Sequence, residues 1–265
     1  PLFRSGLTRT AEDFDIVAQA LADDSQNPRR VVAVDYRGRG RSDFDPNPAN
    51  YTVPIETTDV LALAAAAGIS RGIFLGTSRG GLISMVIAAT HPELPAGIIL
   101  NDIGPKLDIT GLMKIKGYIA PRVTPQTWNE AVAGLQRLFG SVFPALAEAD
   151  WLVWAHRAFR QDAGGRLIRT YDPALAHTFD SISPETPPPS LWELFDQMAK
   201  VPLLSICGEL SDLLSRDCVA EMKRRRPDME TCDVPLQGHA PLLADDPTIE
   251  RIKDFCRRCE RARHA

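Results

Sequence analysis

Residues 73–81 read Ile73-Phe74-Leu75-Gly76-Thr77-Ser78-Arg79-Gly80-Gly81, and the segment 82–89 that follows is apolar on almost every face. This order predicts a buried strand, a tight turn and a buried helix. A Gly-x-Ser-x-Gly pattern in that context is typical of a nucleophile elbow, a turn so sharp that the serine hydroxyl projects above the sheet. Gly76 and Gly80 are expected there because larger side chains would collide with neighbouring backbone.

Ser78 needs a base, and His239 is the candidate among the five histidines. It lies in Gln237-Gly238-His239-Ala240-Pro241, just past the strand-like stretch 229–234. A loop after a late parallel strand opens at the same sheet edge as the elbow. The alternative for His239 is a surface-loop role. Weaker candidates stand at a predicted helix end, in a tryptophan-rich region and at the chain terminus: His91, His156, His177 and His264.

A carboxylate should orient the base, and Asp212 is our choice. It follows the buried strand predicted at 201–207, in the turn Gly208-Glu209-Leu210-Ser211-Asp212. In that position its carboxylate would fix the tautomer of His239 and stabilise the imidazolium. Glu209 on the same loop and Asp102 after the strand at 96–101 remain alternatives. The structural alternative for Asp212 is a helix N-cap.

Strand and helix patterns alternate along most of the chain. Strands are predicted at 31–35, 72–75, 96–101, 201–207 and 229–234, and helices at 12–21, 58–67, 78–90, 216–225 and 248–261. Such alternation predicts an α/β fold with a mostly parallel sheet covered by helices on both faces. Sites in such sheets open at the carboxyl ends of the strands, where Ser78, Asp212 and His239 all fall.

One long segment interrupts this alternation. It contains all four tryptophans, has helical patterns at 126–139 and 143–160, and ends in the proline-rich stretch 183–190. Since a single crossover needs far fewer residues, we expect residues 106–190 to form a helical cap over Ser78. Residues 1–105 and 191–265 would then form the core. The aromatic side chains of the cap should mostly pack against one another, with a few facing substrate.

Composition fits one globular domain with an insertion. The net charge of −4 gives no reason to expect nucleic acid or membrane as partners, and no apolar run is long enough for a membrane span. The five cysteines follow no regular disulfide or zinc spacing, which favours a reducing compartment, and we expect a cytoplasmic location. Oligomeric state cannot be read from these patterns.

The chain resembles the α/β-hydrolase superfamily. The resemblance rests on the order Ser78, Asp212, His239 and on the stretch Val31-Val32-Ala33-Val34-Asp35-Tyr36-Arg37-Gly38-Arg39-Gly40-Arg41-Ser42. It is similar to the small, cofactor-independent serine hydrolases with a helical cap. This implies cleavage of a small carboxylic ester through an acyl-enzyme on Ser78, with no organic cofactor and no metal. The substrate would be a small molecule with an apolar acyl or alcohol part.

The resemblance also implies an oxyanion hole made by the backbone N–H groups of Leu7 and Arg79. In the family the corresponding strand ends in His-Gly or Pro-Gly; here Gly6 matches and Ser5 stands in the first position. On this alignment two edge strands would precede Pro1. The Arg79 side chain has two interpretations, attraction of an acidic substrate group or pairing with a nearby carboxylate. The Arg37–Arg41 loop is expected to be structural rather than phosphate-binding.

Two other classes of function use the same fold. A ligand-binding receptor or carrier would keep the triad with little turnover, and a lyase or haloperoxidase would use it for a different reaction.

Overall fold

The fold is built on a six-stranded sheet with the order β2-β1-β3-β4-β7-β8. The computed structural model describes residues 1–4, 6–119 and 124–261. Its sheet contains the strands β1 (Leu2–Arg4), β2 (Val32–Val34), β3 (Gly72–Thr77), β4 (Pro95–Asn101), β7 (Leu203–Gly208) and β8 (Glu230–Val234). All five pairings are parallel, which confirms the predicted α/β class.

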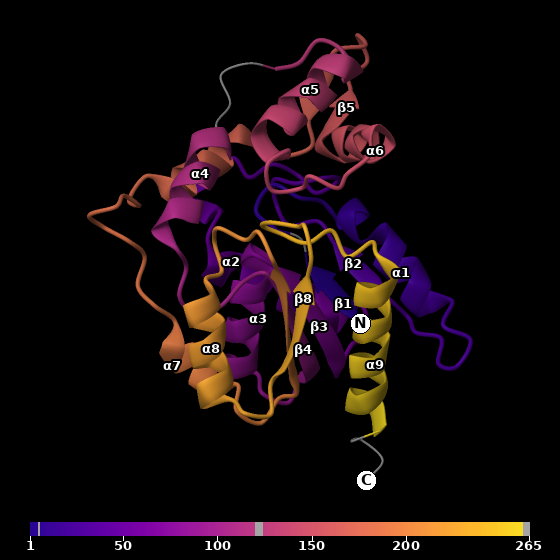
Figure 1. The fold of residues 1–265 in the computed structure, drawn as a ribbon, viewed down its shortest axis with the longest axis vertical. Coiled ribbons are helices and arrows are strands. Elements are labelled where there is room, and N and C mark those ends of the chain that lie inside the picture. Colours follow the sequence, from indigo (N-terminus) through magenta and orange to yellow (C-terminus); the bar gives the residue numbers. More distant parts are fainter. Residues whose placement is uncertain (5, 120–123, 262–265) are drawn as a thin grey trace.

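Helices cover both faces of this sheet (Figure 1). One face packs on α2 (Val53–Ala66), α3 (Arg79–Thr90), α7 (Trp192–Gln197) and α8 (Arg216–Arg225). The other face packs on α1 (Asp15–Ala22), which follows the short 3-10 helix η1 (Ala11–Phe14), and on α9 (Asp246–Arg261). The strand side chains divide accordingly: Phe74 belongs to the first core, and Ile73 and Leu75 belong to the second.

Two helices differ most from their predicted bounds. Helix α2 begins at Val53 rather than at 58, because the Thr52 side chain accepts a hydrogen bond from the Ile55 N–H at 3.4 Å and Pro54 suits the first turn. The helix predicted over 143–160 is shorter, since α6 covers only Glu148–Ala158. Its last residues instead form β5 (Phe159–Gln161), which pairs antiparallel with β6 (Leu167–Arg169).

Most of the segment between β4 and β7 lies over the carboxyl ends of the core strands (Figure 1). It contains α4 (Ile109–Ile119), α5 (Trp128–Phe139), α6, the β5–β6 pair and the 3-10 helix η3 (Pro173–Phe179). At its base the Leu191 N–H donates to the Pro105 carbonyl at 2.6 Å, which brings the two ends of the segment together. We therefore propose that residues 106–190 form a cap domain on the core.

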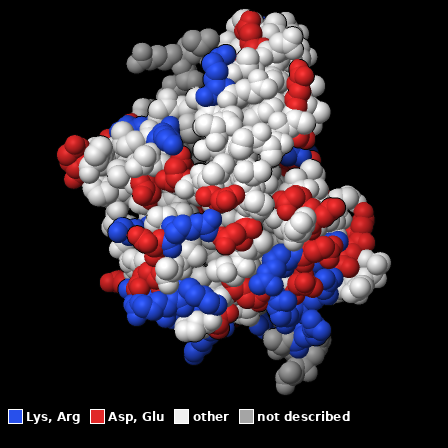
Figure 2. Space-filling view, in the orientation of Figure 1, with Lys and Arg blue, Asp and Glu red and all other residues white. Residues whose placement is uncertain are grey.

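The visible surfaces of the two regions differ in charge. Acidic and basic side chains are intermixed over the core, while the visible face over α5 and α6 is largely uncharged (Figure 2). Leu138, Leu152 and Val153 are exposed on these two helices. Within residues 1–4, 6–119 and 124–261, no helix is both long and apolar enough to cross a membrane.

Candidate active site

Ser78 stands in the strained turn between β3 and α3. Its backbone has φ +50° and ψ −117°, a conformation that L-residues rarely adopt and that persists only where surrounding structure enforces it. The turn is tight because a Cβ at Gly76 would lie 2.4 Å from the Gly80 carbonyl carbon, so glycine is needed there. The Ser78 N–H donates to the Asn101 carbonyl on the neighbouring strand at 3.0 Å. The sequence pattern therefore corresponds to a nucleophile elbow in three dimensions.

The structure brings His239 to this serine. Its Nε2 lies 2.9 Å from Ser78 Oγ, and its side chain is 9% exposed. The loop that carries it is tied to the elbow by Asn101, whose Nδ2 donates to the Pro241 carbonyl at 2.9 Å and to Thr77 Oγ1 at 3.0 Å. The loop of the base candidate is thus held against the turn that contains Ser78.

Asp102 occupies the position beside His239 that we predicted for Asp212. His239 Nδ1 lies 2.8 Å from Asp102 Oδ2, and the aspartate is completely buried. Asp102 follows β4 directly, with φ +54°, which turns its side chain toward the serine rim. Two further donors satisfy it: the Gly208 N–H at 2.8 Å and Ser211 Oγ at 2.6 Å. A buried carboxylate with three partners is well suited to holding an imidazole in one tautomer.

The prediction that Asp212 orients His239 is wrong, and the structure gives a physical reason. Beyond β7 the loop runs outward, and the Asp212 carboxylate pairs with Lys114 of α4 at 2.7 Å, with 27% of its side chain exposed. Glu209, the other alternative on this loop, accepts a hydrogen bond from the Leu236 N–H at 2.9 Å. The loop after β7 does contact the site, but through Ser211.

Three other histidines, all within the described part of the chain, lie away from Ser78 in other roles. His91 is the C-cap residue of α3. The ring of His156 packs on Trp128 with centroids 3.8 Å apart, and His177 pairs with Asp180 at 2.9 Å. His264 and Ser5 lie outside the described residues.

A cavity, partly open to solvent, lies between Ser78 and the segment above it. Its apolar walls come mainly from the interrupting segment and include Ile115, Tyr118, Leu135, Leu138, Phe139, Trp154, Phe159 and Tyr171. Burial raises the pKa of the Tyr118 phenol well above its ordinary value, so this side chain contributes no charge to the cavity. Of the four tryptophans, Trp154 faces the cavity, while Trp151 stacks behind it.

A second cavity adjoins the first beside His239. The two share Ile115, Tyr118, Leu138, Phe139 and His239, and the second is bounded on its far side by the Lys114–Asp212 pair. The site therefore has room for substrate groups on both sides of the serine–histidine pair.

Behind the serine, two arginines share one carboxylate. Glu56 on α2 is fully buried and accepts from Arg39 Nη1 at 2.6 Å and from Arg79 Nε at 2.5 Å. Arg39 also donates to the Leu7 carbonyl at 2.7 Å, and Arg79 donates to the Tyr51 carbonyl at 2.8 Å. The Arg79 side chain is thus paired within the chain, the second of its two interpretations. Sequence reasoning missed Glu56 because the predicted helix began two residues after it.

The loop around Arg37 is also structural, as expected. The Arg37 guanidinium forms two bonds of 2.6 Å to the Asp59 carboxylate and one of 2.6 Å to Asp45. These neighbours hold the pKa of the guanidinium above its usual value.

Leu7 and Arg79 border the serine. Leu7 lines the same cavity as Ser78. A Cβ built at the adjacent Gly6 would lie 3.6 Å from Ser78 Cβ, so the backbone after β1 passes close to Ser78. Arg79 is the first residue of α3, where a backbone N–H has no carbonyl one turn earlier in the helix to bind.

Comparisons with known proteins show which family the chain belongs to. The profile of the group described as the alpha/beta hydrolase family matches residues 5–251. A 3-hydroxybutyrate-oligomer hydrolase of Cupriavidus necator is 35% identical, over 94% of this chain and 85% of the relative. A 2-(acetamidomethylene)succinate hydrolase of Mesorhizobium japonicum is 24% identical, over 96% of this chain and 86% of the relative. The crystal structure of an alpha/beta hydrolase from Novosphingobium aromaticivorans superposes with a TM-score of 0.89 at 38% identity, covering 97% of this chain and 88% of that one.

Proposed function

Because the chain belongs to the alpha/beta hydrolase family, we propose that it is a serine hydrolase that cleaves a small carboxylic ester through an acyl-enzyme on Ser78. One observation carries the proposal: Ser78, His239 and Asp102 form a continuous hydrogen-bonded chain with links of 2.9 and 2.8 Å. These hydrogen-bonded side chains border a concave cavity with mostly apolar walls, the usual setting of a small-molecule site.

In the proposed mechanism His239 acts first as base and then as acid. It takes the Ser78 proton on Nε2 as the serine oxygen attacks the ester carbonyl, and it returns that proton to the departing alcohol. A water molecule then gives a proton to His239 and attacks the acyl-enzyme, which releases the acid and restores Ser78. Asp102 stays ionised and stabilises the imidazolium in both half-reactions.

The backbone N–H groups of Leu7 and Arg79 are the proposed oxyanion donors. Support comes from the close approach of the Gly6 backbone to Ser78 and from the position of Arg79 at the helix N-terminus. The partial positive charge of that helix end favours a developing oxyanion.

An ester is favoured over other acyl substrates because hydroxy acids join to one another through ester bonds, and the Cupriavidus necator relative is named for an oligomer of one. A substrate with an apolar acyl or alcohol part suits the aromatic walls of the cavity.

Labelling and turnover test the proposal together. A fluorophosphonate probe should label the wild-type protein at Ser78, and a series of 4-nitrophenyl esters should be hydrolysed by the wild type but not by Ser78→Ala. Equal rates for the two proteins would rule out the mechanism. Absence of labelling would favour the alternative of a ligand-binding protein.

We also propose a cytoplasmic location, on the state of the cysteines. All five are free thiols, and Cys207, Cys218, Cys256 and Cys259 are buried. Free buried thiols are typical of proteins from reducing compartments. Quantitative thiol titration of protein purified from its native host, with and without denaturant, checks this.

A further inference from the structure

The cavity above Ser78 is positively charged although the chain as a whole is negatively charged. Among the described residues that line it are three arginines, Arg9, Arg157 and Arg169, against one carboxylate, Asp13. The adjoining cavity adds Lys114 and Arg137 against Asp212. The net charge of the chain is −4. A cavity of opposite sign to its protein concentrates anions.

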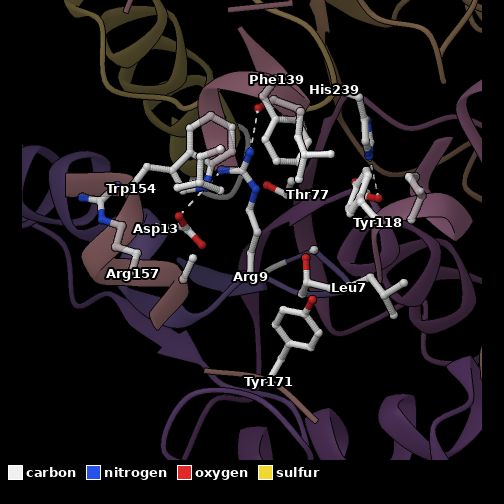
Figure 3. Close-up of a pocket in the computed structure, with 18 of the residues that line it drawn as sticks. Leu7, Arg9, Asp13, Thr77, Tyr118, Phe139, Trp154, Arg157, Tyr171 and His239 are labelled. Atoms are coloured by element: carbon white, nitrogen blue, oxygen red, sulfur yellow. Dashed lines mark hydrogen bonds and ion pairs between the residues drawn. The ribbon is translucent and has the colours of Figure 1, made fainter. Parts of the chain in front are cut away.

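Arg9 lies close to the reacting groups. Its Cγ lies 3.9 Å from the position that a Cβ at Gly6 would occupy, and Ser78 Cβ lies 3.6 Å from the same point. Its Nη2 donates to the carbonyl of Ala240, the residue after His239, at 3.4 Å. Figure 3 shows the Arg9 guanidinium in the middle of the cavity, whereas Arg157 lies at its edge with its guanidinium turned away from Arg9.

The guanidinium of Arg9 is held in place but weakly bonded. It lies over the Trp154 ring at 4.9 Å, which fixes its plane. Its ion pair with Asp13 is 3.6 Å long, and the bond to Ala240 is also at the long end of the range. By contrast, Arg37 in this same chain binds Asp59 through two bonds of 2.6 Å.

Asp13 does not neutralise Arg9 fully because it also belongs to a helix cap. Its Oδ2 accepts the Thr10 N–H at 3.1 Å at the start of η1, which leaves Oδ1 toward Arg9. Arg169 adds a second cation on the far wall, over the rings of Phe159 and Tyr171. Burial partly removes water from the Arg169 guanidinium, and this desolvation lowers its pKa.

We infer that the substrate is an ester that carries a free carboxylate, and that Arg9 binds this carboxylate next to the scissile bond. A guanidinium presents parallel N–H groups that match a carboxylate in two bonds, and such charge-assisted bonds are the strong ones. The inference rests on the proposed hydrolase function and adds the substrate class to it. Arg9 would act on binding, since its donors lie beside the reacting atoms rather than on them.

A matched pair of esters tests this inference. In 4-nitrophenyl hydrogen adipate the acyl chain ends in a carboxylate, and in 4-nitrophenyl adipamate an amide of the same shape replaces it. With the uncatalysed rate subtracted, the wild type should favour the acid ester by about 10- to 100-fold in kcat/KM. Arg9→Gln should abolish this preference, mainly through KM, and change the neutral ester by less than about threefold.

Three further variants sharpen the result. Arg9→Lys keeps the charge but not the paired donors, so it should retain part of the preference. Asp13→Asn keeps the side-chain shape and removes the competing carboxylate, so KM for the acid ester should fall. Arg71→Gln removes an exposed arginine at the opposite end of β3 and should leave both esters unchanged.

Binding without turnover separates this inference from the proposed function. Calorimetry with Ser78→Ala should show tighter binding of the acid ester, and the additional Arg9→Gln change should remove the difference. Equal binding of both esters, or an equal loss on both in Arg9→Gln, would overturn the inference and leave the hydrolase proposal intact. Selective binding of the acid ester by a wild type that hydrolyses neither ester would do the reverse.

Discussion

Arginines stand both behind and in front of Ser78, and the two groups differ in where their partners lie. Behind the serine, Arg39 and Arg79 bind the buried Glu56 and the carbonyls of Leu7 and Tyr51 at 2.5–2.8 Å. In front, among the residues that the structure describes, Arg9 has a 3.6 Å ion pair, a 3.4 Å hydrogen bond and a contact with the Trp154 ring at 4.9 Å. Behind Ser78, therefore, the arginines form their hydrogen bonds within the chain. In front of Ser78, the guanidinium of Arg9 faces a cavity.

This difference indicates how to separate structural charges from ligand-binding ones. A buried charge is tolerated only where nearby groups replace the water it has lost. For charges such as Glu56 and Asp102, groups of the chain itself replace the lost water. Mutation of such a charge should change the stability of the fold or the geometry of the reacting groups. A charge that has only long bonds to the chain should instead affect which ligand the protein binds.

The largest expected effect concerns Asp102, the most completely satisfied of these charges. Asp102→Asn keeps the shape but presents the wrong hydrogen-bonding partner to His239, so kcat should fall by about 10⁴-fold. Asp212→Asn, at a partly exposed position paired with Lys114, should change kcat by less than about threefold. Steady-state kinetics on a neutral 4-nitrophenyl ester measures both; a larger loss in Asp212→Asn would reverse our assignment.

Removal of Glu56 should cost stability. Glu56→Gln leaves the Arg39 and Arg79 cations in a buried position without a counter-charge, which should lower the free energy of unfolding by about 3–5 kcal/mol. Guanidinium chloride denaturation followed by circular dichroism measures it. Glu93→Gln, at an exposed turn, is the control and should change stability by less than about 0.5 kcal/mol. A loss as small as this control's in Glu56→Gln would mean that the two groups of arginines do not differ.

Arg39 allows a direct contrast with Arg9. Since Arg39 holds the Leu7 carbonyl beside the proposed oxyanion hole, Arg39→Gln should lower kcat by about tenfold on the acid and the neutral ester alike. The ratio of kcat/KM for the two esters should stay at the wild-type value, unlike in Arg9→Gln. A changed ratio would show that the arginine behind the serine also selects substrate.

Much of the fold followed from local sequence patterns, because each pattern was carried by residues adjacent in the chain. The apolar run, paired glycines and apolar helix around Ser78 specify the elbow, and alternating strands and helices specify the parallel sheet. His239 was found from its place after a late strand. These inferences needed only the periodicity and the order of the elements.

The acid could not be chosen in this way. The loops after β4 and β7 reach the same rim of the sheet, so both Asp102 and Asp212 satisfied the argument from chain order. What decides between them is side-chain direction: Asp102 has a positive φ, and Lys114 of α4 binds Asp212. Aspartate tolerates that backbone conformation, yet nothing local in the sequence requires it.

Glu56 did leave a signal in the sequence. Thr52 followed by Pro54 is a helix start, which would have placed Glu56 in the first turn of α2 rather than before the helix. Its pairing with two arginines from other elements, by contrast, depends on tertiary packing alone.

The smallest expected effect is a pH dependence of stability that arises from the buried thiol of Cys207, near Asp102. Burial raises the pKa of Cys207 from 9.0 to about 12, and the nearby Asp102 carboxylate adds to the shift. The folded protein therefore holds this proton more tightly than the unfolded chain, and the resulting stability is complete below pH 9 and lost as the pH rises toward 12. Denaturation midpoints measured between pH 8 and 11 should fall less steeply in Cys207→Ala than in the wild type. Parallel curves for the two proteins would mean that this thiol is not shielded from water as its burial requires.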